Sequence, residues 1–271
     1  MTLKARFELR DKLGEGTASE VFAAFDRNLR RHVAIKIFRR FGPGEIYAET
    51  RQRFLVDARA AARLTHPNII TVYDAGNFGE GVAIVMELAK ESLRKMLNKT
   101  PILPWETISS IGAQIADGLK CMHDNEIFHR DIKPANILMV SDNIAKIGDF
   151  GLAHLPMSDL TRSGTVIGTP KYMSPEQVQG QSIDYRTDIF SLGVVLFEML
   201  TGRTPFESPP ADDQVVMSRI VRELAVKPSQ LNPQVPPGFD RILLRALAKD
   251  PQDRYQDAGE FAAALRSYEK H

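Results

Sequence analysis

The chain has 271 residues, of which 43% are hydrophobic and 25% charged, and its formal net charge is +1. This balance is typical of a globular protein with a sizeable core, and it gives no overall field that would attract nucleic acid or an anionic membrane. The single cysteine, Cys121, excludes an internal disulfide framework. No apolar run reaches the roughly 18 residues of a membrane span, and the polar start is unlike a secretory signal. We therefore expect a cytoplasmic chain, or the cytoplasmic part of a longer, membrane-anchored protein.

The first third of the chain reads as β-structure. Runs rich in β-branched and aromatic residues, separated by glycine-rich or charged turns, are Phe7–Leu13, Val21–Phe25, His32–Phe38, Ile69–Ala75 and Val82–Glu87. Between the third and fourth runs, residues 45–65 are rich in Ala and Arg and predict one helix.

Beyond residue 91 the pattern becomes helical. The predicted helices are Ile108–His123, Thr187–Leu200, Val215–Leu224, Phe239–Ala248 and Ala258–Tyr268. A short hairpin is predicted from Ile137–Val140 and Ile144–Ile147, around the turn residues 141–143. The chain is therefore expected to be an α+β protein, with a small β-rich part before a larger helical part and a boundary at Met86–Glu91.

Two short motifs lie in the β-rich part. Gly14 and Gly16 sit between two strands, where glycines let backbone N–H groups approach phosphate oxygens, although a plain β-turn explains them equally well. Ser19 stands where a third glycine would complete the pattern. In Val33-Ala34-Ile35-Lys36, alternation places Ala34 and Lys36 on one face of a strand. A lysine on an apolar strand needs an anionic partner, unless it is an edge-strand charge that faces water.

The most informative segment runs from His129 to Asn136 and continues at Asp149-Phe150-Gly151. Asn136 begins the first strand of the predicted hairpin, and Asp149 follows the second, so an antiparallel hairpin brings the two side by side. An amide oxygen and a carboxylate together suit a hard cation such as Mg²⁺. Asp131 lies in a loop where a hydroxyl could approach it, and Lys133 adds a positive charge.

This ordered set resembles the eukaryotic-type, or Hanks-type, protein kinase catalytic domain in its bacterial Ser/Thr branch. The resemblance covers about Phe7 to Tyr268 and also includes Ser174-Pro175-Glu176 and Asp188. It implies a bilobal fold with an N-lobe over residues 1–87, a hinge over 88–91 and a C-lobe over 92–271. It further implies transfer of the γ-phosphate of ATP, with Mg²⁺ or alternatively Mn²⁺, to Ser or Thr hydroxyls of protein substrates. A homodimer through the small lobe is a further implication that no residue here establishes.

The resemblance assigns roles to the charged residues. Lys36 would hold the α- and β-phosphates, Asp131 would be the catalytic base, and Lys133 would meet the γ-phosphate. Asn136 and Asp149 would be the metal ligands. A lysine two residues after the base is typical of the Ser/Thr branch, as is Thr169, which is otherwise an ordinary turn residue before a proline.

The resemblance also predicts a nucleotide site. Met86 would be the gatekeeper, and the backbone of the next three residues would bind adenine, while Val21, Ala34 and Leu138 would sandwich the purine. For these apolar positions, core packing is the plainer interpretation. The predicted nucleotide-binding residues are Leu13, Gly14, Gly16, Val21, Ala34, Lys36, Met86, Glu87, Ala89 and Leu138.

An activation segment is expected from Asp149 to Glu176. We expect phosphorylation there at one or more of three hydroxyls, with Arg130 as a partner for the phosphate. The candidates are Thr161, Ser163 and Thr165; the alternative is a solvated loop with incidental hydroxyls.

Two further carboxylates and one arginine are assigned at the same time. Asp188 is expected to cap backbone N–H groups, at its helix or in the catalytic loop. Glu176 and Arg254 resemble the structural ion pair of the large lobe.

One position departs from the family pattern. The glutamate expected to pair with Lys36 is replaced by Asp57, which is one methylene shorter. Asp57 would pair with Lys36 directly or through water, or would instead form a surface pair with Arg53; Glu49 is a substitute under a different helix placement.

Two other functions stay open at this stage: a catalytically silent pseudokinase scaffold that binds nucleotide, and a small-molecule kinase of related fold.

Overall fold

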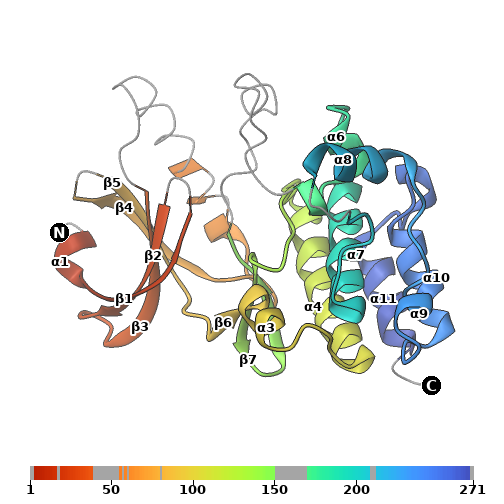
Figure 1. The fold of residues 1–271 in the computed structure, drawn as a ribbon. Coiled ribbons are helices and arrows are strands. Elements are labelled where there is room, and N and C mark those ends of the chain that lie inside the picture. The colour runs from red at the N-terminus through yellow and green to blue at the C-terminus, as the bar shows by residue number, and fades with distance from the viewer. Residues whose placement is uncertain are drawn as a thin grey trace. The chain divides into compact units, whose positions relative to one another are not determined.

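The computed structural model describes residues 3–16, 19–38, 55–56, 58–59, 61–79, 81–149, 170–207 and 212–268. These residues form two compact units, each with its own core (Figure 1). The smaller unit comprises the described residues up to Lys90, together with Asp149. The larger unit comprises Glu91 to Gly148 and the described residues from Pro170 onward.

The smaller unit is built on a five-stranded antiparallel sheet in the order β1-β2-β3-β5-β4. Its elements are α1 (Leu3–Arg6), β1 (Phe7–Glu15), β2 (Ser19–Asp26), β3 (Arg31–Phe38), β4 (Val72–Phe78) and β5 (Gly81–Met86). All five predicted strands are present. The fourth, predicted at Ile69–Ala75, begins only at Val72, because Ile69 and Ile70 are buried as core anchors ahead of the strand.

The two faces of this sheet are covered by different apolar clusters. One face buries the apolar cluster Phe7, Ala24, Val33, Ile35, Phe78, Ala83 and Val85. On the other face, Phe38, Val82 and Ile84 pack against Ala58, which lies in the helical stretch. Residues 55–56, 58–59 and 61–63 are helical, which confirms the predicted helix over the part of 45–65 that is described.

The larger unit is mainly helical. Its helices are α3 (Leu93–Lys99), α4 (Trp105–Asp124), α6 (Pro175–Val178), α7 (Arg186–Thr201), α8 (Asp213–Arg222), α9 (Pro228–Leu231), α10 (Pro237–Ala246) and α11 (Ala258–Tyr268), with short 3₁₀ turns at Pro170–Tyr172 and Pro251–Asp253. A small sheet of β6 (Glu91–Ser92), β7 (Ile137–Ser141) and β8 (Ile144–Ile147) has the order β6-β7-β8.

Helix α7 lies at the centre of this unit. Every residue of α7 except Arg186, Glu198 and Thr201 is buried, as expected for a helix that is apolar on all sides. It packs on α4, α10 and α11 (Figure 1). Gly112 of α4 makes the close approach possible, because a Cβ there would lie within 3.0 Å of Leu196 in α7 and Leu265 in α11.

The five long helices and the hairpin were predicted correctly, and α11 has the predicted bounds. The sequence did not predict the short elements α1, α3, α6, α9 and β6. Each spans at most about two turns, which is too short for an apolar period to show. Among the described residues, the structure contains no helix with the length and apolar character needed to cross a membrane.

Candidate active site

Strand register gathers the predicted nucleotide residues on one face of the smaller unit's sheet. Residues directly opposite each other in a ladder share a face. Val21 pairs with Lys36, and Lys36 pairs with Ile84. Ala34 pairs with Met86 on the same face, which is the face opposite the Phe7 cluster. The alternation read from Val33–Lys36 is therefore confirmed.

Lys36 is a buried cation with an anionic partner. Only 7% of its side chain is exposed, and its ammonium group forms an ion pair with the carboxylate of Asp149, which is 36% exposed. Lys36 Nζ also lies 5.3 Å from the centre of the Phe38 ring. These contacts exclude the reading of Lys36 as an edge-strand charge in water.

Asp149 has a left-handed backbone, with a φ of +64°. Arg130 has the same conformation, with a φ of +63°. Non-glycine residues in this region are strained, and such residues cluster at functional sites. Among the described residues, Arg30 and Glu126 also have a positive φ, whereas Arg130 and Asp149 fall within the two segments that the sequence selected for chemistry.

Two of the predicted catalytic residues and one predicted metal ligand meet in the loop before β7. Lys133 Nζ lies 2.7 Å from Asp131 Oδ2. The amide Nδ2 of the buried Asn136 donates to the backbone oxygen of Asp131 at 2.8 Å and to its Oδ2 at 3.0 Å. Two acceptors on the nitrogen fix the orientation of the amide, so Asn136 Oδ1 remains available as an oxygen ligand. The carboxylate of Asp131 is nearly half exposed, at 48%, which leaves it accessible to a substrate hydroxyl.

His129 ties this loop to the end of β8. Its Nε2 lies 3.0 Å from the Gly148 carbonyl, and its Nδ1 accepts from the Asp131 N–H at 3.3 Å. A carbonyl oxygen only accepts, so Nε2 carries the proton of its contact with Gly148. The Gly148 N–H also donates to the Asn136 carbonyl at 2.8 Å, which confirms that the hairpin brings its two ends together.

Asp188 binds the backbone of the loop that contains His129, Arg130 and Asp131. It lies in the first turn of α7, and its fully buried carboxylate accepts from the His129 N–H at 2.9 Å and the Arg130 N–H at 2.7 Å. The expectation that it caps its own helix is wrong, because α7 begins two residues earlier. The expected contact with the catalytic-loop backbone is confirmed.

The surroundings of Asp188 favour its charged form. Burial alone raises the pKa of this carboxyl group. The hydrogen bond from His123 at 2.9 Å, the charges of His123 and His129, and the His129 N–H together outweigh burial, and the pKa lies below its ordinary value. Asp188 thus carries a negative charge beside the backbone N–H groups of His129 and Arg130.

A second set of contacts anchors the segment after Pro170. Arg254 and Glu176 form the expected ion pair, with two parallel hydrogen bonds of 2.7 and 2.8 Å, and both are buried. Ser174 and Gln177 form a capping box at α6, and Gln177 Nε2 donates to the Arg130 carbonyl at 2.8 Å. The Ser-x-x-Gln spacing was a readable signal for this cap that sequence reasoning missed.

The residues that are predicted to bind adenine follow β5. The Glu87 N–H donates to the Thr71 carbonyl at 2.9 Å, and Met86 packs beside Ile84 and Val72. Within the described residues, the backbone N–H and carbonyl of Ala89 form no hydrogen bond. Ala89 therefore presents a free donor and a free acceptor, as an adenine edge requires.

The glycine turn and the predicted purine contacts lie at the ends of strands. The Gly16 N–H donates to the Ser19 carbonyl at 2.8 Å, and a Cβ on Gly14 would meet nothing within 4 Å. Leu13 precedes this turn on β1. Leu138 of β7 packs against Gly148, where a Cβ would lie 2.7 Å from Leu138 Cδ1. The openness above Gly14 is compatible with a bound phosphate.

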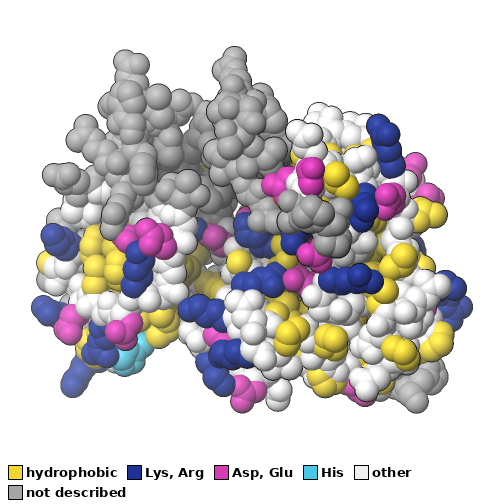
Figure 2. Space-filling view, in the orientation of Figure 1, with side chains coloured by type: hydrophobic (Ala, Val, Ile, Leu, Met, Phe, Trp, Pro, Cys, Tyr) yellow, Lys and Arg dark blue, Asp and Glu magenta, His cyan; other side chains and the backbone are white. Residues whose placement is uncertain are grey.

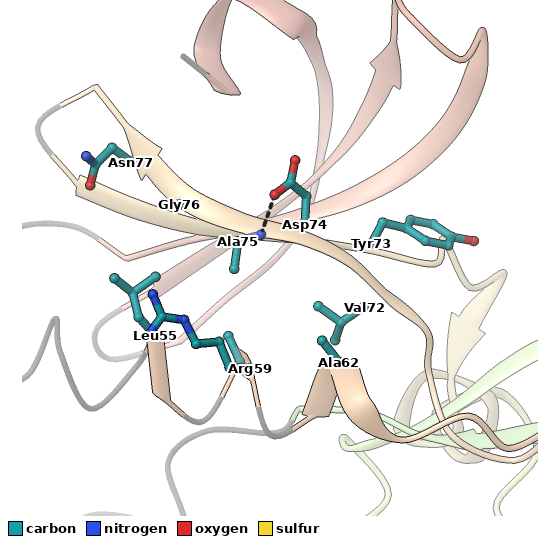
Figure 3. Close-up of a pocket in the computed structure, with 10 residues that line it drawn as sticks. Leu55, Arg59, Ala62, Val72, Tyr73, Asp74, Ala75, Gly76 and Asn77 are labelled. Atoms are coloured by element: carbon teal, nitrogen blue, oxygen red, sulfur yellow. Dashed lines mark hydrogen bonds between the residues drawn. The ribbon is translucent and has the colours of Figure 1, made fainter. Parts of the chain in front are cut away.

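The smaller unit also has a hollow of about 300 Å³ between its helical residues and β4 (Figure 3). Figure 3 shows Leu55 and Arg59 on the helical side and Val72 to Asn77 on the strand side. The Asp74 carboxylate accepts from the Ala75 N–H at 2.9 Å. None of the predicted site residues that the structure describes lines this hollow.

Several predictions fall outside the described residues. These are the pairing of Asp57 with Lys36 and the phosphorylation of Thr161, Ser163 or Thr165. Thr17, Ala18, Thr169 and the Phe150-Gly151 part of the Asp149 motif are also outside them. Lys36 and Asp149 belong to the smaller unit, and Asp131, Lys133 and Asn136 to the larger unit.

A sheet that carries a buried lysine–aspartate pair and a helical unit that carries an Asp–Lys–Asn loop together define a kinase catalytic domain. The sequence profile described as "Protein kinase domain" matches residues 7–265. The chain belongs to this protein kinase domain family.

Relatives agree over nearly the whole chain. A probable serine/threonine-protein kinase of Clostridium perfringens is 38% identical over 98% of the chain and 38% of its own length. A probable serine/threonine-protein kinase of Clostridium acetobutylicum is 38% identical over 97% and 40%. The serine/threonine-protein kinase PknB of Mycobacterium leprae is 40% identical over 97% and 43%. The chain thus spans about two fifths of the length of these curated relatives.

Proposed function

We propose that this protein transfers the γ-phosphate of ATP to Ser or Thr hydroxyls of protein substrates. The observation that carries the proposal is the loop in which Asn136 and Lys133 both contact the accessible carboxylate of Asp131. The printed names of the relatives, all serine/threonine-protein kinases, support the same residue class. The serine/threonine class also accounts for a lysine at position 133.

Asp131 orients the substrate hydroxyl and accepts its proton in this proposal. Asn136 holds one carboxylate oxygen of Asp131, so the other oxygen faces the hydroxyl in a fixed direction. Lys133, already beside Asp131, balances the negative charge that spreads over the transferred group. Lys36 acts in the same way on the phosphates that stay with ADP.

The oxygen donors fit Mg²⁺, with Mn²⁺ as an alternative. Asn136 Oδ1 and the Asp149 carboxylate are hard oxygen ligands, and Mg²⁺ in such sites takes few protein ligands besides phosphates and water. Among the described residues there is no cluster of three His, Cys, Asp or Glu that would hold an ion without the nucleotide. When bound, the ion would neutralise phosphate charge, and these two residues would hold it.

The test is mass spectrometry of the purified chain and a generic protein substrate after incubation with ATP and Mg²⁺. We expect phosphate on Ser and Thr, including one or more of Thr161, Ser163 and Thr165. Asp131→Asn should lower the rate by about 10²–10⁴-fold, because it removes the base but keeps the shape. Equal, negligible incorporation in both proteins would instead favour the pseudokinase scaffold. Phosphorylation of small alcohols but not of proteins would favour a small-molecule kinase.

Other parts of the assignment are proposals of the same kind. We propose an N-lobe over residues 1–87, a hinge over 88–91 and a C-lobe over 92–271, with adenine bound by the backbone of Glu87 and Ala89. We also propose that the domain works in the cytoplasm, either alone or as part of a membrane-anchored protein, where the lone Cys121 stays reduced. Light scattering would detect a homodimer.

A further inference from the structure

The larger unit contains a cavity of about 470 Å³ beside the proposed base. Its wall includes Arg94 of α3, Lys133 of the catalytic loop, Lys171 and Tyr172, Glu198 of α7, and the segment from Gly202 to Glu207. Lys133 connects the two sites, because it lines the cavity while its ammonium group lies 2.7 Å from Asp131. The part of the cavity lined by Lys133 is therefore one side chain away from the proposed base.

The carboxylate of Glu198, which lines the cavity, is already neutralised. Arg94 makes two parallel hydrogen bonds to Glu198, of 3.0 Å to Oε1 and 3.1 Å to Oε2. The Tyr172 hydroxyl donates to Glu198 Oε2 at 2.7 Å. Burial of Tyr172, followed by the charge of Glu198, raises the pKa of this phenol, so it stays protonated and keeps donating. Glu198 consequently has no free carboxylate oxygen for a cationic ligand.

Positive charge exceeds negative charge around the cavity. Its wall carries four cations, Arg94, Lys133, Lys171 and Arg203, against two carboxylates, Glu198 and Glu207. Lys171 pairs with Glu207 at 3.2 Å. The exposed guanidinium of Arg203 has no ion-pair partner in the part of the chain that the structure describes. Figure 2 shows lysine and arginine side chains gathered over α3 and the neighbouring surface of this unit.

A buried hydroxyl in the wall also lacks a partner. Thr204 is only 5% exposed, and its Oγ1 makes no hydrogen bond to any described residue. A buried hydroxyl without a partner costs free energy unless a ligand or water completes it. Thr204 follows Arg203 directly in the chain, and both residues line the cavity.

We propose that this cavity binds an anionic side chain of the protein substrate, a carboxylate or a phosphate, close in sequence to the hydroxyl that receives phosphate. This inference rests on the proposed function and names its substrate class. Arg203 supplies the unpaired charge, and the Thr204 hydroxyl donates a hydrogen bond. An extended chain advances about 3.3 Å per residue, so the anionic residue lies about two to four positions from the acceptor.

The test compares peptides that share one acceptor threonine in a neutral sequence. Each peptide carries Glu, phosphoserine, Ala or Lys at one position within four residues on either side of the acceptor. At one position we expect kcat/KM to be about twofold to fivefold higher for Glu than for Ala, as expected of a partly exposed ion pair. Lys should be disfavoured there. A preference restricted to phosphoserine would identify prior phosphorylation as the source of the charge.

Substitutions in the cavity wall test which residues cause the preference for Glu over Ala. Arg203→Glu should reduce the Glu-to-Ala ratio of kcat/KM to one or below. Arg241→Glu is the matched control, because Arg241 is an exposed arginine on α10 with no partner among the described residues; this variant should keep the wild-type ratio. Thr204→Val keeps the shape and removes the hydroxyl. It should lower the ratio about threefold while the melting temperature stays equal or rises.

The inference is overturned if the wild-type protein does not discriminate among the peptides, or if Arg203→Glu and Arg241→Glu give the same ratio. A Thr204→Val protein that loses stability but keeps the ratio would make the hydroxyl structural. Phosphorylation of the Ala peptide, and its loss in Asp131→Asn, reports on the proposed function separately. If no peptide is phosphorylated, fluorescence anisotropy of the labelled Glu, Ala and Lys peptides decides the inference from binding alone.

Discussion

Asp188 is the residue on which the catalytic loop depends most directly. Its carboxylate satisfies the backbone N–H groups of His129 and Arg130, and Arg130 is held with a positive φ. A strained backbone of this kind persists only when its surroundings over-determine it. Asp188 therefore supports the backbone on which the proposed base, Asp131, is carried.

The lowered pKa of Asp188 predicts the sign of a pH effect on stability. A carboxyl group whose pKa is lower in the folded than in the unfolded state stabilises the fold above its unfolded pKa, about 4. That contribution is lost as pH falls through the folded pKa. We expect Asp188→Asn to be less stable than wild type at pH 7, and the difference in melting temperature to shrink below about pH 4.

Melting curves of both proteins from pH 7 to pH 3 provide the measurement. A difference that stayed constant across this range would mean that Asp188 stabilises the fold by packing rather than by charge. Asp124→Asn is a suitable control, because Asp124 is an exposed carboxylate that pairs with Lys120 at the surface. Its effect on stability should be small throughout.

At the scale of elements, the sheet of the smaller unit is set by close backbone approach. Gly81 begins β5 beside the end of β3, and a Cβ placed on Gly81 would collide with the backbone carbonyl of Phe38. Backbone atoms cannot move aside as a side-chain tip can. The register that aligns Lys36 with Ile84 and Ala34 with Met86 therefore depends on glycine at this position.

Gly81→Ala is expected to lower the free energy of unfolding of the smaller unit by about 1–3 kcal/mol, because an overpacked contact forces a backbone shift. Gly14→Ala is the control, since no atom lies within 4 Å of its added Cβ. Chemical denaturation followed by circular dichroism would compare the two. Equal stabilities for the two variants would show that the strand end adjusts freely.

At the scale of the whole molecule, binding of the nucleotide should stabilise the folded state. At a concentration of 100 times Kd, a ligand that binds only the folded protein adds about 2.7 kcal/mol. For a chain of this size, that corresponds to a rise of roughly 5–10 °C in melting temperature, at about 2–4 °C per kcal/mol. We expect this shift with ATP and Mg²⁺ together, and a smaller one after EDTA removes the metal.

Lys36→Met should reduce the shift, since the variant loses the lysine proposed to bind phosphate. Arg27→Met, which removes an exposed cation from the same unit, should not. A full shift in Lys36→Met would contradict the proposed role of Lys36. The measurement is the melting temperature of wild type, Lys36→Met and Arg27→Met, with and without ATP, Mg²⁺ and EDTA.

Local patterns in the sequence determined a large part of this structure. The period of two in Val33–Lys36 placed Ala34 and Lys36 on one face, and the hairpin signal brought together the two ends of the hairpin, where the Gly148 N–H donates to the Asn136 carbonyl. The long helices were also readable, because an apolar period persists over several turns. These features depend on neighbours a few residues apart, which is the range over which backbone geometry repeats.

Only the tertiary structure decided how distant segments meet. Asp188 lies 59 residues from the His129 N–H that it accepts, and Glu198 lies 104 residues from Arg94. For Asp188 the sequence left open a cap at its own helix and a contact with the backbone of the 129–136 loop, and it gave no sign of the Arg94 contact, because charge and spacing alone do not say which helices pack together. Packing of α7 against its neighbours brings these groups within hydrogen-bonding distance, and it therefore decides which carboxylate supports the loop and which is neutralised.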